Sequence, residues 1–232
     1  MNIAAVWVAS GANFIAEACA SAKSFKAHHA SVDTHLLTPD LINRPAHFNH
    51  IISVTRNRSL KWYHNCVQWY QLLPDLADHI FLFDTDTHIC APLDNLTTLL
   101  SHFEFLGCHA PGRHTTGTLY PNLQDEFPEV NIGFIAFKST PSVRVLLKNW
   151  LYLYNTNPDT YGNNDQGPLR DALLQWNGSL YILPPEYNFR FQFGGQVRNR
   201  VRVLHGRSKN IVAAASRINK TVDIRSYHRG EF

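Results

Sequence analysis

Short apolar runs of strand length alternate with longer stretches of helical spacing through most of the chain. The apolar runs are rich in β-branched and aromatic residues, which favour strands. Predicted strands cover residues 3–9, 32–37, 50–54, 80–83, 103–109, 130–137, 180–183 and 201–204. Predicted helices cover residues 14–28, 59–73, 93–101, 142–154 and 169–176. Because strand, helix and strand recur within the first sixty residues, the pattern predicts an α/β fold with a parallel sheet.

The longest stretch without a predicted element is residues 111–129, which contains Gly, Pro, Thr, Asn and acidic residues. Loops of this length inside a compact domain are usually functional. No internal repeat, low-complexity segment or linker interrupts the chain. Its 232 residues, 44% hydrophobic and 17% charged, suffice for a sizeable core. We therefore predict a single α/β domain spanning residues 1–232.

The charge balance is weakly basic, with 21 Lys and Arg against 18 Asp and Glu. This excess does not demand nucleic acid as a partner. The basic residues of the C-terminal third are Arg198, Arg200, Arg202, Arg207, Lys209, Arg217, Lys220, Arg225 and Arg229. They are candidates for contact with anionic phosphates or for peripheral contact with an anionic membrane, a solvated face being the alternative.

The four cysteines are far apart and form no C-x-x-C pair, so we interpret them as small buried residues in a reducing compartment. The N-terminal apolar run lacks the basic start of a signal peptide and is too short to span a bilayer. We interpret this run as the first strand of the fold. We therefore expect a cytoplasmic protein.

Two carboxylates follow the apolar strand of the sequence HIFLFDTDTHICAP at residues 79–92. If Asp84 to Asp86 stays extended, alternation places both carboxylates on the same face. Two carboxylates that converge at a strand end suit a hard divalent cation, which takes oxygen ligands. The alternative is that both residues simply cap a turn, since Asp favours turns.

Three later motifs occur in order after the D-T-D sequence: an N-I-G strand, an N-D-Q helix start and a late H-G-R-S-K segment. Together they resemble the GT-A glycosyltransferases, which use nucleotide-diphospho-sugars. The resemblance covers nearly the whole chain. It is greatest to the family 8-like branch, with small viral glycosyltransferase domains as another relative. It implies one Rossmann-like GT-A domain whose central sheet is mixed, mostly parallel and flanked by helices.

The resemblance implies a metal site on the donor diphosphate. In such enzymes the D-x-D carboxylates and a histidine near the C-terminus are the protein ligands, here Asp84, Asp86 and His205. A mixed oxygen and imidazole shell suits Mn²⁺ better than Mg²⁺, the alternative ion. His88 is a competing histidine that we interpret as structural. Lys209, four residues after His205, is expected to face the β-phosphate, and Arg207 is a candidate to share this role.

Donor nucleotides are expected at the carboxyl ends of the first strands, as in other open α/β sheets. The candidates there are Ala9, Ser10, Gly11, Asn13 and Thr85. Asp33 and Thr38 flank the second predicted strand and are candidates for reading the base, with ordinary turn chemistry as the alternative. For Arg58 and Lys61 the resemblance implies a basic contact with ribose or phosphate, the alternative being a solvated helix face.

The acceptor is expected across the metal, beside Asn131, Asp165 and Gln166. An inverting enzyme needs a carboxylate base, for which Asp165 is the candidate. A retaining enzyme of the family 8 kind has a polar side chain at the anomeric carbon, for which Gln166 is the candidate. The alternative for Asp165 is an N-cap. His109, Ala110 and the loop 111–129 are candidates for shaping the sugar pocket or closing over the donor. Tyr187, Phe189, Phe191 and Phe193 are candidates for a sugar-stacking aromatic wall, the alternative being the hydrophobic core.

Three other function classes compete with a glycosyltransferase. A haloacid-dehalogenase-like phosphatase has threonine where this chain has His88, and its motif follows the first strand. A nucleic-acid binder has no supporting motif here. The third is a non-catalytic GT-A-like sugar-binding domain. We predict an Mn²⁺-dependent glycosyltransferase that moves a sugar from a nucleoside-diphosphate donor, UDP-linked, to a glycan or lipid-linked glycan acceptor, without nucleic acid as a partner.

Overall fold

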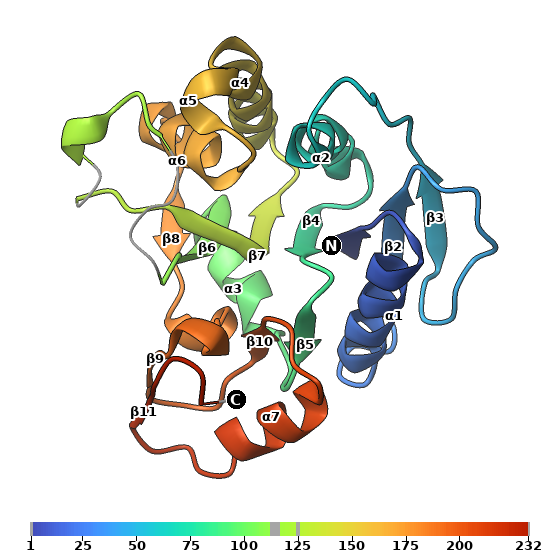
Figure 1. Ribbon diagram of the computed structural model, residues 1–232, viewed down its shortest axis with the longest axis vertical. Coiled ribbons are helices and arrows are strands. Elements are labelled where there is room, and N and C mark those ends of the chain that lie inside the picture. The colour runs from blue at the N-terminus through green and yellow to red at the C-terminus, as the bar shows by residue number, and fades with distance from the viewer. Residues whose placement is uncertain (1, 112–116, 124–125, 232) are drawn as a thin grey trace.

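A seven-stranded sheet with the order β3-β2-β1-β4-β7-β6-β8 forms the centre of the protein (Figure 1). The computed structural model describes residues 2–111, 117–123 and 126–231. The sheet strands are β1 Ile3–Val8, β2 Asp33–Thr38, β3 His50–Ser53, β4 His79–Phe83, β6 Phe105–His109, β7 Val130–Lys138 and β8 Leu180–Ile182. Strand β7 is antiparallel to β4 and β6, and the other neighbours are parallel. The predicted mixed, mostly parallel sheet is confirmed.

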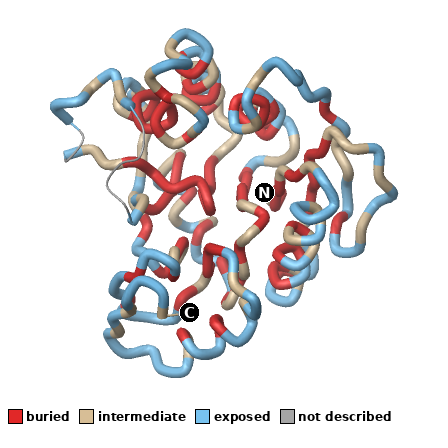
Figure 2. The backbone as a smooth tube through the Cα atoms, in the orientation of Figure 1, coloured by how far each residue is buried: buried red, intermediate tan, exposed pale blue. Residues whose placement is uncertain are grey.

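Helices cover both faces of this sheet. Helices α1 (Ala12–Lys26) and α3 (Asn95–His102) pack on one face. Helices α2 (Trp62–Tyr70), α4 (Pro141–Thr156) and α6 (Gln166–Gln175) pack on the other, and the short α5 (Pro158–Tyr161) follows α4. The buried residues follow the sheet and the inner helix faces, while exposed residues lie outside (Figure 2).

Strand β4 is buried along its whole length because helices cover it on both sides. Ile80 and Leu82 enter the core beneath α2, α4 and α6, whereas Phe81 and Phe83 enter the core beneath α1 and α3. The side chains thus alternate between two apolar layers, which is why this run contains no polar position between residues 80 and 83. The strand delivers Asp84 to a rigid edge of the sheet.

The C-terminal segment forms a third apolar cluster beside the sheet. Strand β10 (Val203–His205) pairs antiparallel with β5 (Thr87–Ile89), and β11 (Arg225–Tyr227) pairs with β9 (Gly195–Val197). Helix α7 (Ile211–Ile218) packs over this cluster. The short 3₁₀ helices are η1 Leu73–Asp75, η2 Pro121–Leu123, η3 Pro185–Tyr187 and η4 Phe191–Phe193. The β5–β10 pair places His205 next to the end of β4.

Several sequence predictions need correction. The sequence did not predict β5, β9, β11, α5 and α7, and β11 follows the segment predicted as the last strand. Helix α2 spans only Trp62–Tyr70, because η1 with Pro74 replaces the last predicted turn. Part of the loop predicted at 111–129 lies outside the described residues, so its role as a lid remains a prediction.

The basic residues of the C-terminal third are partly used inside the protein. Arg202 donates to the carbonyl of Pro92, Arg217 pairs with Glu231, and Arg225 donates to the carbonyls of Asp223 and Asn199; Arg207 pairs with Glu17. The two ion pairs, of Arg207 and Arg217, offset part of the charge that this region offers to a surface. Within the described ranges, no helix has the length and apolar composition needed to cross a bilayer.

Candidate active site

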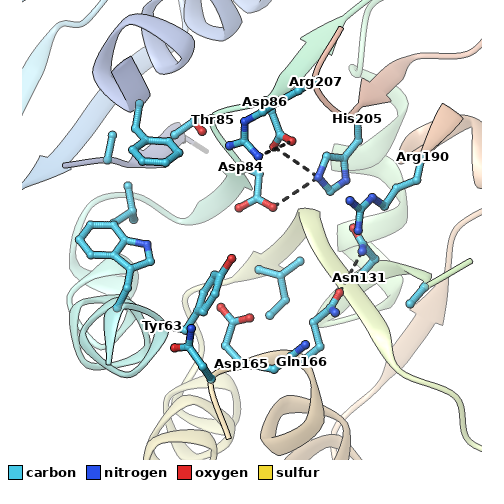
Figure 3. A pocket seen from close by; sticks show the side chains of 18 of the residues that line it. Tyr63, Asp84, Thr85, Asp86, Asn131, Asp165, Gln166, Arg190, His205 and Arg207 are labelled. Carbon is cyan, nitrogen blue, oxygen red and sulfur yellow. Dashed lines mark hydrogen bonds and ion pairs between the residues drawn. The ribbon is translucent and has the colours of Figure 1, made fainter. Parts of the chain in front are cut away.

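A cavity of about 810 Å³ lies where the carboxyl ends of β1 and β4 meet the C-terminal segment (Figure 3). Its wall contains the predicted residues Ala9, Ser10, Asp84, Thr85, Asp86, Asn131, Asp165, Gln166 and His205. Ligands of open α/β sheets bind at this edge. The structure therefore brings most of the predicted site together.

The D-x-D carboxylates lie in a turn rather than on an extended strand. The Asp84 amide still continues the sheet by donating to the Gly133 carbonyl at 3.0 Å, and the chain then turns at Thr85 and Asp86. Thr87 Oγ1 closes the turn by donating to the Asp84 carbonyl at 2.8 Å. The Gly206 amide donates to the Asp86 carbonyl at 2.9 Å. The extended arrangement, which would have placed both carboxylates on one face, is not found, and the turn still aims both carboxylates at His205.

His205 faces both carboxylates through one ring nitrogen. Its Nε2 lies 3.5 Å from Asp84 Oδ2 and 3.4 Å from Asp86 Oδ1. Its Nδ1 lies 2.9 Å from Asn188 Oδ1. The Asn188 amide nitrogen donates to the Asn131 carbonyl and side-chain oxygens, so its own oxygen is the acceptor for the His205 Nδ1–H. This second interaction fixes the tautomer that leaves Nε2 free for a metal.

The sheet leaves room for the His205 ring only because residue 133 is glycine. A Cβ at Gly133 would lie 2.0 Å from His205 Nδ1 and 2.8 Å from Asn131 Oδ1. No side chain larger than hydrogen fits there without displacing the imidazole. The N-I-G sequence thus serves two purposes: Asn131 holds Asn188, and Gly133 accommodates the histidine.

Electrostatics couple the three groups. Burial alone would lower the pKa of His205, but the carboxylates of Asp84 and Asp86 raise it above the ordinary histidine value. Burial raises the pKa of Asp86, but His205 and Arg207 outweigh burial and lower that pKa. Such a mutually stabilised set of two carboxylates and an imidazole is held together by charge, and a divalent cation can replace the proton.

The donor set fits a divalent cation. One ligand atom from each of Asp84, Asp86 and His205 lies within 4.8 Å of the others. Asp84 is 47% exposed, so the cluster is open to the cavity on one side and leaves positions for ligand oxygens. His88, the competing histidine, lies on β5 and does not line this cavity.

Arg207, rather than Lys209, contributes the cation beside the cluster. The Arg207 guanidinium donates to Glu17 at 2.8 and 3.0 Å and lies 3.5 Å from Asp86 Oδ2. Glu17 also accepts from Thr85 Oγ1 at 2.8 Å, so one carboxylate of α1 orients both residues. Lys209 is exposed and does not line the cavity.

Only some of the residues predicted to contact the donor line the cavity. Ala9 and Ser10 line the cavity, whereas Gly11 and Asn13 are exposed at the start of α1. Asp40, which the sequence analysis missed, accepts from the Gly11 amide at 2.6 Å and from Ser10 Oγ at 3.3 Å.

Asp33 requires a correction. It pairs with Ala4 at the amino end of β2, so it lies at the far end of the sheet from the cavity, where it is 3.8 Å from His50. Thr38 lies at the correct end, but it is buried and its hydroxyl accepts from the Asp40 amide. Thr38 therefore supports the turn and does not face a ligand.

A second hollow of about 600 Å³ adjoins the main cavity beyond the ends of β1, β2 and β3. Ser10 and Arg56 line both spaces, and Arg58 lines the second. The Arg56 guanidinium lies 5.5 Å from the centre of the Trp62 ring. Lys61 is exposed and lines neither space. Arg56 lies in an irregular segment before α2, which explains why no sequence pattern indicated it.

Asn131, Asp165 and Gln166 meet on the opposite wall. Asn131 Nδ2 donates to Gln166 Oε1 at 2.9 Å. Asp165 occupies the N-cap position of α6, but its side chain makes no capping hydrogen bond; Asn164 Oδ1 accepts from the Gln166 amide instead. The N-cap alternative for the Asp165 carboxyl is therefore wrong.

The Asp165 carboxyl lies in an unusual environment. The side chain is buried, and burial together with the charge of Asp84 raises its pKa to about 8. Trp150 Nε1 donates to the Asp165 carbonyl at 2.9 Å and fixes the backbone there. A buried carboxyl with a strongly raised pKa at a cavity wall is typical of an acid or base in a reaction.

Solved structures share this fold, although no protein-family model and no curated protein matches the sequence. The galactosyltransferase LgtC, in complex with donor and acceptor sugar analogs, matches with a TM-score of 0.65 and 17% identity over 94% of both chains. A Gln-to-Glu active-site mutant of LgtC gives 0.61 and 16% over the same shares. The fold is that of the GT-A glycosyltransferases. The resemblance found in the sequence is thus confirmed for the fold.

A structure of another protein, the glycosyltransferase GlyE from Streptococcus pneumoniae TIGR4, matches with a TM-score of 0.62 and 14% identity. The match covers 90% of this chain and 55% of the GlyE chain.

The cavity wall beyond His205 also contains Arg190 and Phe193. Of the predicted aromatic wall, Phe193 lines the cavity, whereas Phe189 and Phe191 are buried in the C-terminal cluster. Tyr187 packs against the core beneath α1 and α3 and does not line the cavity.

Proposed function

We propose that this protein is a glycosyltransferase that moves a sugar from a nucleoside-diphosphate donor, UDP-linked, to a hydroxyl of a glycan or lipid-linked glycan. The observation that carries this proposal is the convergence of Asp84, Asp86 and His205 at the open edge of the sheet. The GT-A fold, shared with proteins described as glycosyltransferases, supports it.

Asp84, Asp86 and His205 would hold Mn²⁺. Asp86 is 10% exposed and pairs with His205 and Arg207, so its carboxylate would bind the metal alone. Asp84 is 47% exposed, so its carboxylate could contact both the metal and the donor ribose. When bound, the ion would neutralise charge on the departing nucleoside diphosphate, an effect worth several kcal/mol. Arg207, oriented by Glu17, adds a second positive charge on the same side.

The donor nucleoside fits best toward Ser10 and Arg56, where the main cavity opens into the adjoining hollow. This direction follows the carboxyl ends of β1, β2 and β3. Arg58 in that hollow is a candidate for contact with the ribose or base. Gly11, Asn13 and Lys61 remain candidates only through movement of their exposed segments, and the same holds for Lys209.

Asn131, Asp165 and Gln166 are proposed to act at the transferred sugar and the acceptor hydroxyl. If the reaction inverts the anomeric centre, Asp165 accepts the hydroxyl proton, for which its raised pKa is suited. If the reaction retains it, Gln166, oriented by Asn131, supplies the polar group at the anomeric carbon. Both alternatives use the same wall.

A hydrolysis screen tests the proposal without knowledge of the acceptor. The protein is incubated with a panel of UDP-, GDP- and CDP-sugars, with Mn²⁺ or with EDTA, and free nucleoside diphosphate is measured. We expect slow release from a UDP-sugar with Mn²⁺ and a loss of at least 100-fold with EDTA. Failure to hydrolyse any donor, despite binding UDP and Mn²⁺, would favour the non-catalytic sugar-binding alternative.

A further inference from the structure

Arg190 is a cation in the cavity wall that the proposed donor chemistry does not use. It lies between Phe189, whose carbonyl accepts from the His205 amide at 2.9 Å, and the fully buried Phe191. The Phe193 amide donates to the Arg190 carbonyl at 2.9 Å. The backbone on both sides is thus fixed against β10, and the guanidinium projects into the cavity beside His205 (Figure 3).

No group within the described ranges neutralises this guanidinium by an ion pair or hydrogen bond. The Arg190 Nε is buried and lacks a hydrogen-bond partner. The Cζ atom of the guanidinium lies 4.7 Å from the centre of the Phe193 ring. Arg207, by contrast, is paired with Glu17 and Asp86. The Nε itself is too buried to be reached, so an anion that arrives through the cavity would meet the Nη groups of this guanidinium, whose charge has no ion-pair partner among the described residues.

The location of Arg190 distinguishes it from the donor side. Figure 3 shows Tyr63 and Thr85 on one side of the Asp84 and Asp86 carboxylates and Arg190 on the other, beyond His205. Ser10 and Arg56, on the donor side, belong to the adjoining hollow at the ends of β1 to β3. A donor extended toward that hollow leaves the Arg190 side for the acceptor.

The neighbouring residues suit a sugar that carries an anion. Phe193 is 45% exposed and offers an aromatic face beside the guanidinium. Stacking on this ring orients the planar guanidinium fork, which matches the two oxygens of a carboxylate or phosphate. Glu129 also lines the cavity, but it is only 1% exposed, so an incoming group would meet the guanidinium rather than that carboxylate.

We propose that Arg190 binds a carboxylate or phosphate group of the acceptor, so that this enzyme glycosylates anionic glycans. This inference rests on the proposed function and names its acceptor class. A neutral acceptor would leave the Arg190 guanidinium without an anionic partner, and a site built to bind a charged group rejects analogues that lack it. Arg190 is therefore a specificity-determining residue of the acceptor side.

Matched pairs of sugars test the proposal directly. Calorimetry with the full chain, Mn²⁺ and UDP measures the affinity for methyl β-glucuronide against methyl β-glucoside, and for mannose 6-phosphate against mannose. We expect at least one charged member to bind roughly tenfold or more tighter than its neutral partner, as for a charge-assisted hydrogen bond. The two pairs distinguish a carboxylate from a phosphate. Equal affinity within both pairs, or no binding of either charged sugar, would overturn the proposal.

Three variants complete the test. Arg190→Gln should abolish the preference for the charged sugar, and Arg190→Lys, which keeps the charge but lacks the fork, should retain part of it. Arg229→Gln is the matched control, because Arg229 also lies against the Phe193 ring, at 6.0 Å, but does not line the cavity. It should leave the preference intact, and an equal loss in this control would contradict a specific role for Arg190.

Donor hydrolysis without acceptor separates this inference from the proposed function. We expect the Arg190→Gln variant to hydrolyse the donor within twofold of wild type and to melt at the same temperature. A variant that instead loses donor hydrolysis or UDP affinity would assign Arg190 to the donor and overturn the proposal. If the wild-type protein hydrolyses no nucleotide sugar, the proposed function itself fails.

Discussion

Burial gives the Asp165 carboxyl its distinctive chemistry. Its folded pKa of about 8 lies far above its value in an unfolded chain, near 4. Between these values the folded state holds a proton that the unfolded state has released. The free energy of unfolding contributed by this group therefore falls as the pH rises through that window, and it is constant below the unfolded pKa.

Asp165→Asn removes this pH dependence while it keeps the shape of the side chain. Relative to the variant, metal-free wild type should lose about 1.4 kcal/mol of unfolding free energy per pH unit between about pH 4.5 and 7.5. Urea unfolding in EDTA at a series of pH values measures the difference. Asp223→Asn, at a group on the exposed surface, is the control and should run parallel to wild type. If the unfolding free energy of Asp165→Asn changed with pH in the same way as that of wild type, the raised pKa of Asp165 would be contradicted.

Arg207 and Lys209 are the two candidates for the cation that contacts the donor diphosphate. The H-G-R-S-K segment suggested Lys209, but the structure places Arg207 in the cavity and Lys209 outside it. Arg207→Gln should therefore weaken UDP binding in the presence of Mn²⁺ about tenfold, because a charge-assisted hydrogen bond contributes about 1.5–3 kcal/mol and solvent screens part of this at the exposed Arg207. Lys209→Gln should leave the affinity within twofold. The opposite order in a UDP titration would restore the sequence-based assignment.

At the scale of elements, β7 and β10 meet at Gly133 and His205. Gly133→Ala would place a methyl group against the imidazole, at 2.0 Å from Nδ1, so the ring must move away from Asn188 and the carboxylates. We expect Mn²⁺ affinity to fall at least tenfold in a calorimetric titration, since supporting groups of a metal ligand have effects of this size.

Ala136→Gly in the same strand is the control for Gly133→Ala. Ala136 is buried in the core beneath α1 and α3, so its loss should lower the melting temperature without altering Mn²⁺ affinity. Retention of full Mn²⁺ affinity by Gly133→Ala would show that His205 does not ligate the metal from the position described here.

The strands of the central sheet and the longer helices that cover it were predictable from the sequence because their apolar patterns are local. The all-apolar β4 run requires helices on both faces, and the two carboxylates after it mark the edge where ligands bind. The pairing of β5 with β10 was not predictable, because three-residue strands separated by more than 110 positions leave no periodic signal. Arg56 and Arg190 were missed for a similar reason, since both lie in irregular segments whose course is set by tertiary packing.

At the scale of the whole molecule, the metal cluster joins two parts of the chain. Asp84 and Asp86 follow the central strand of the sheet, whereas His205 comes from the C-terminal segment with its own apolar cluster. A divalent cation at this junction would bind the folded arrangement and not the unfolded chain, so its affinity adds to stability. The nucleoside diphosphate would then complete the coordination on the open side, where Asp84 is exposed.

The most direct test of this account is calorimetry of UDP binding with Mn²⁺ or with EDTA. Wild type should bind UDP in Mn²⁺ at least 100-fold more tightly than in EDTA, and Asp86→Ala should lose this difference. Asp94→Ala, at a carboxylate that is 75% exposed and pairs with His29 outside the cavity, should behave as wild type. UDP binding that is independent of Mn²⁺, or unchanged in Asp86→Ala, would contradict the assignment of Asp84, Asp86 and His205 as a metal–diphosphate site.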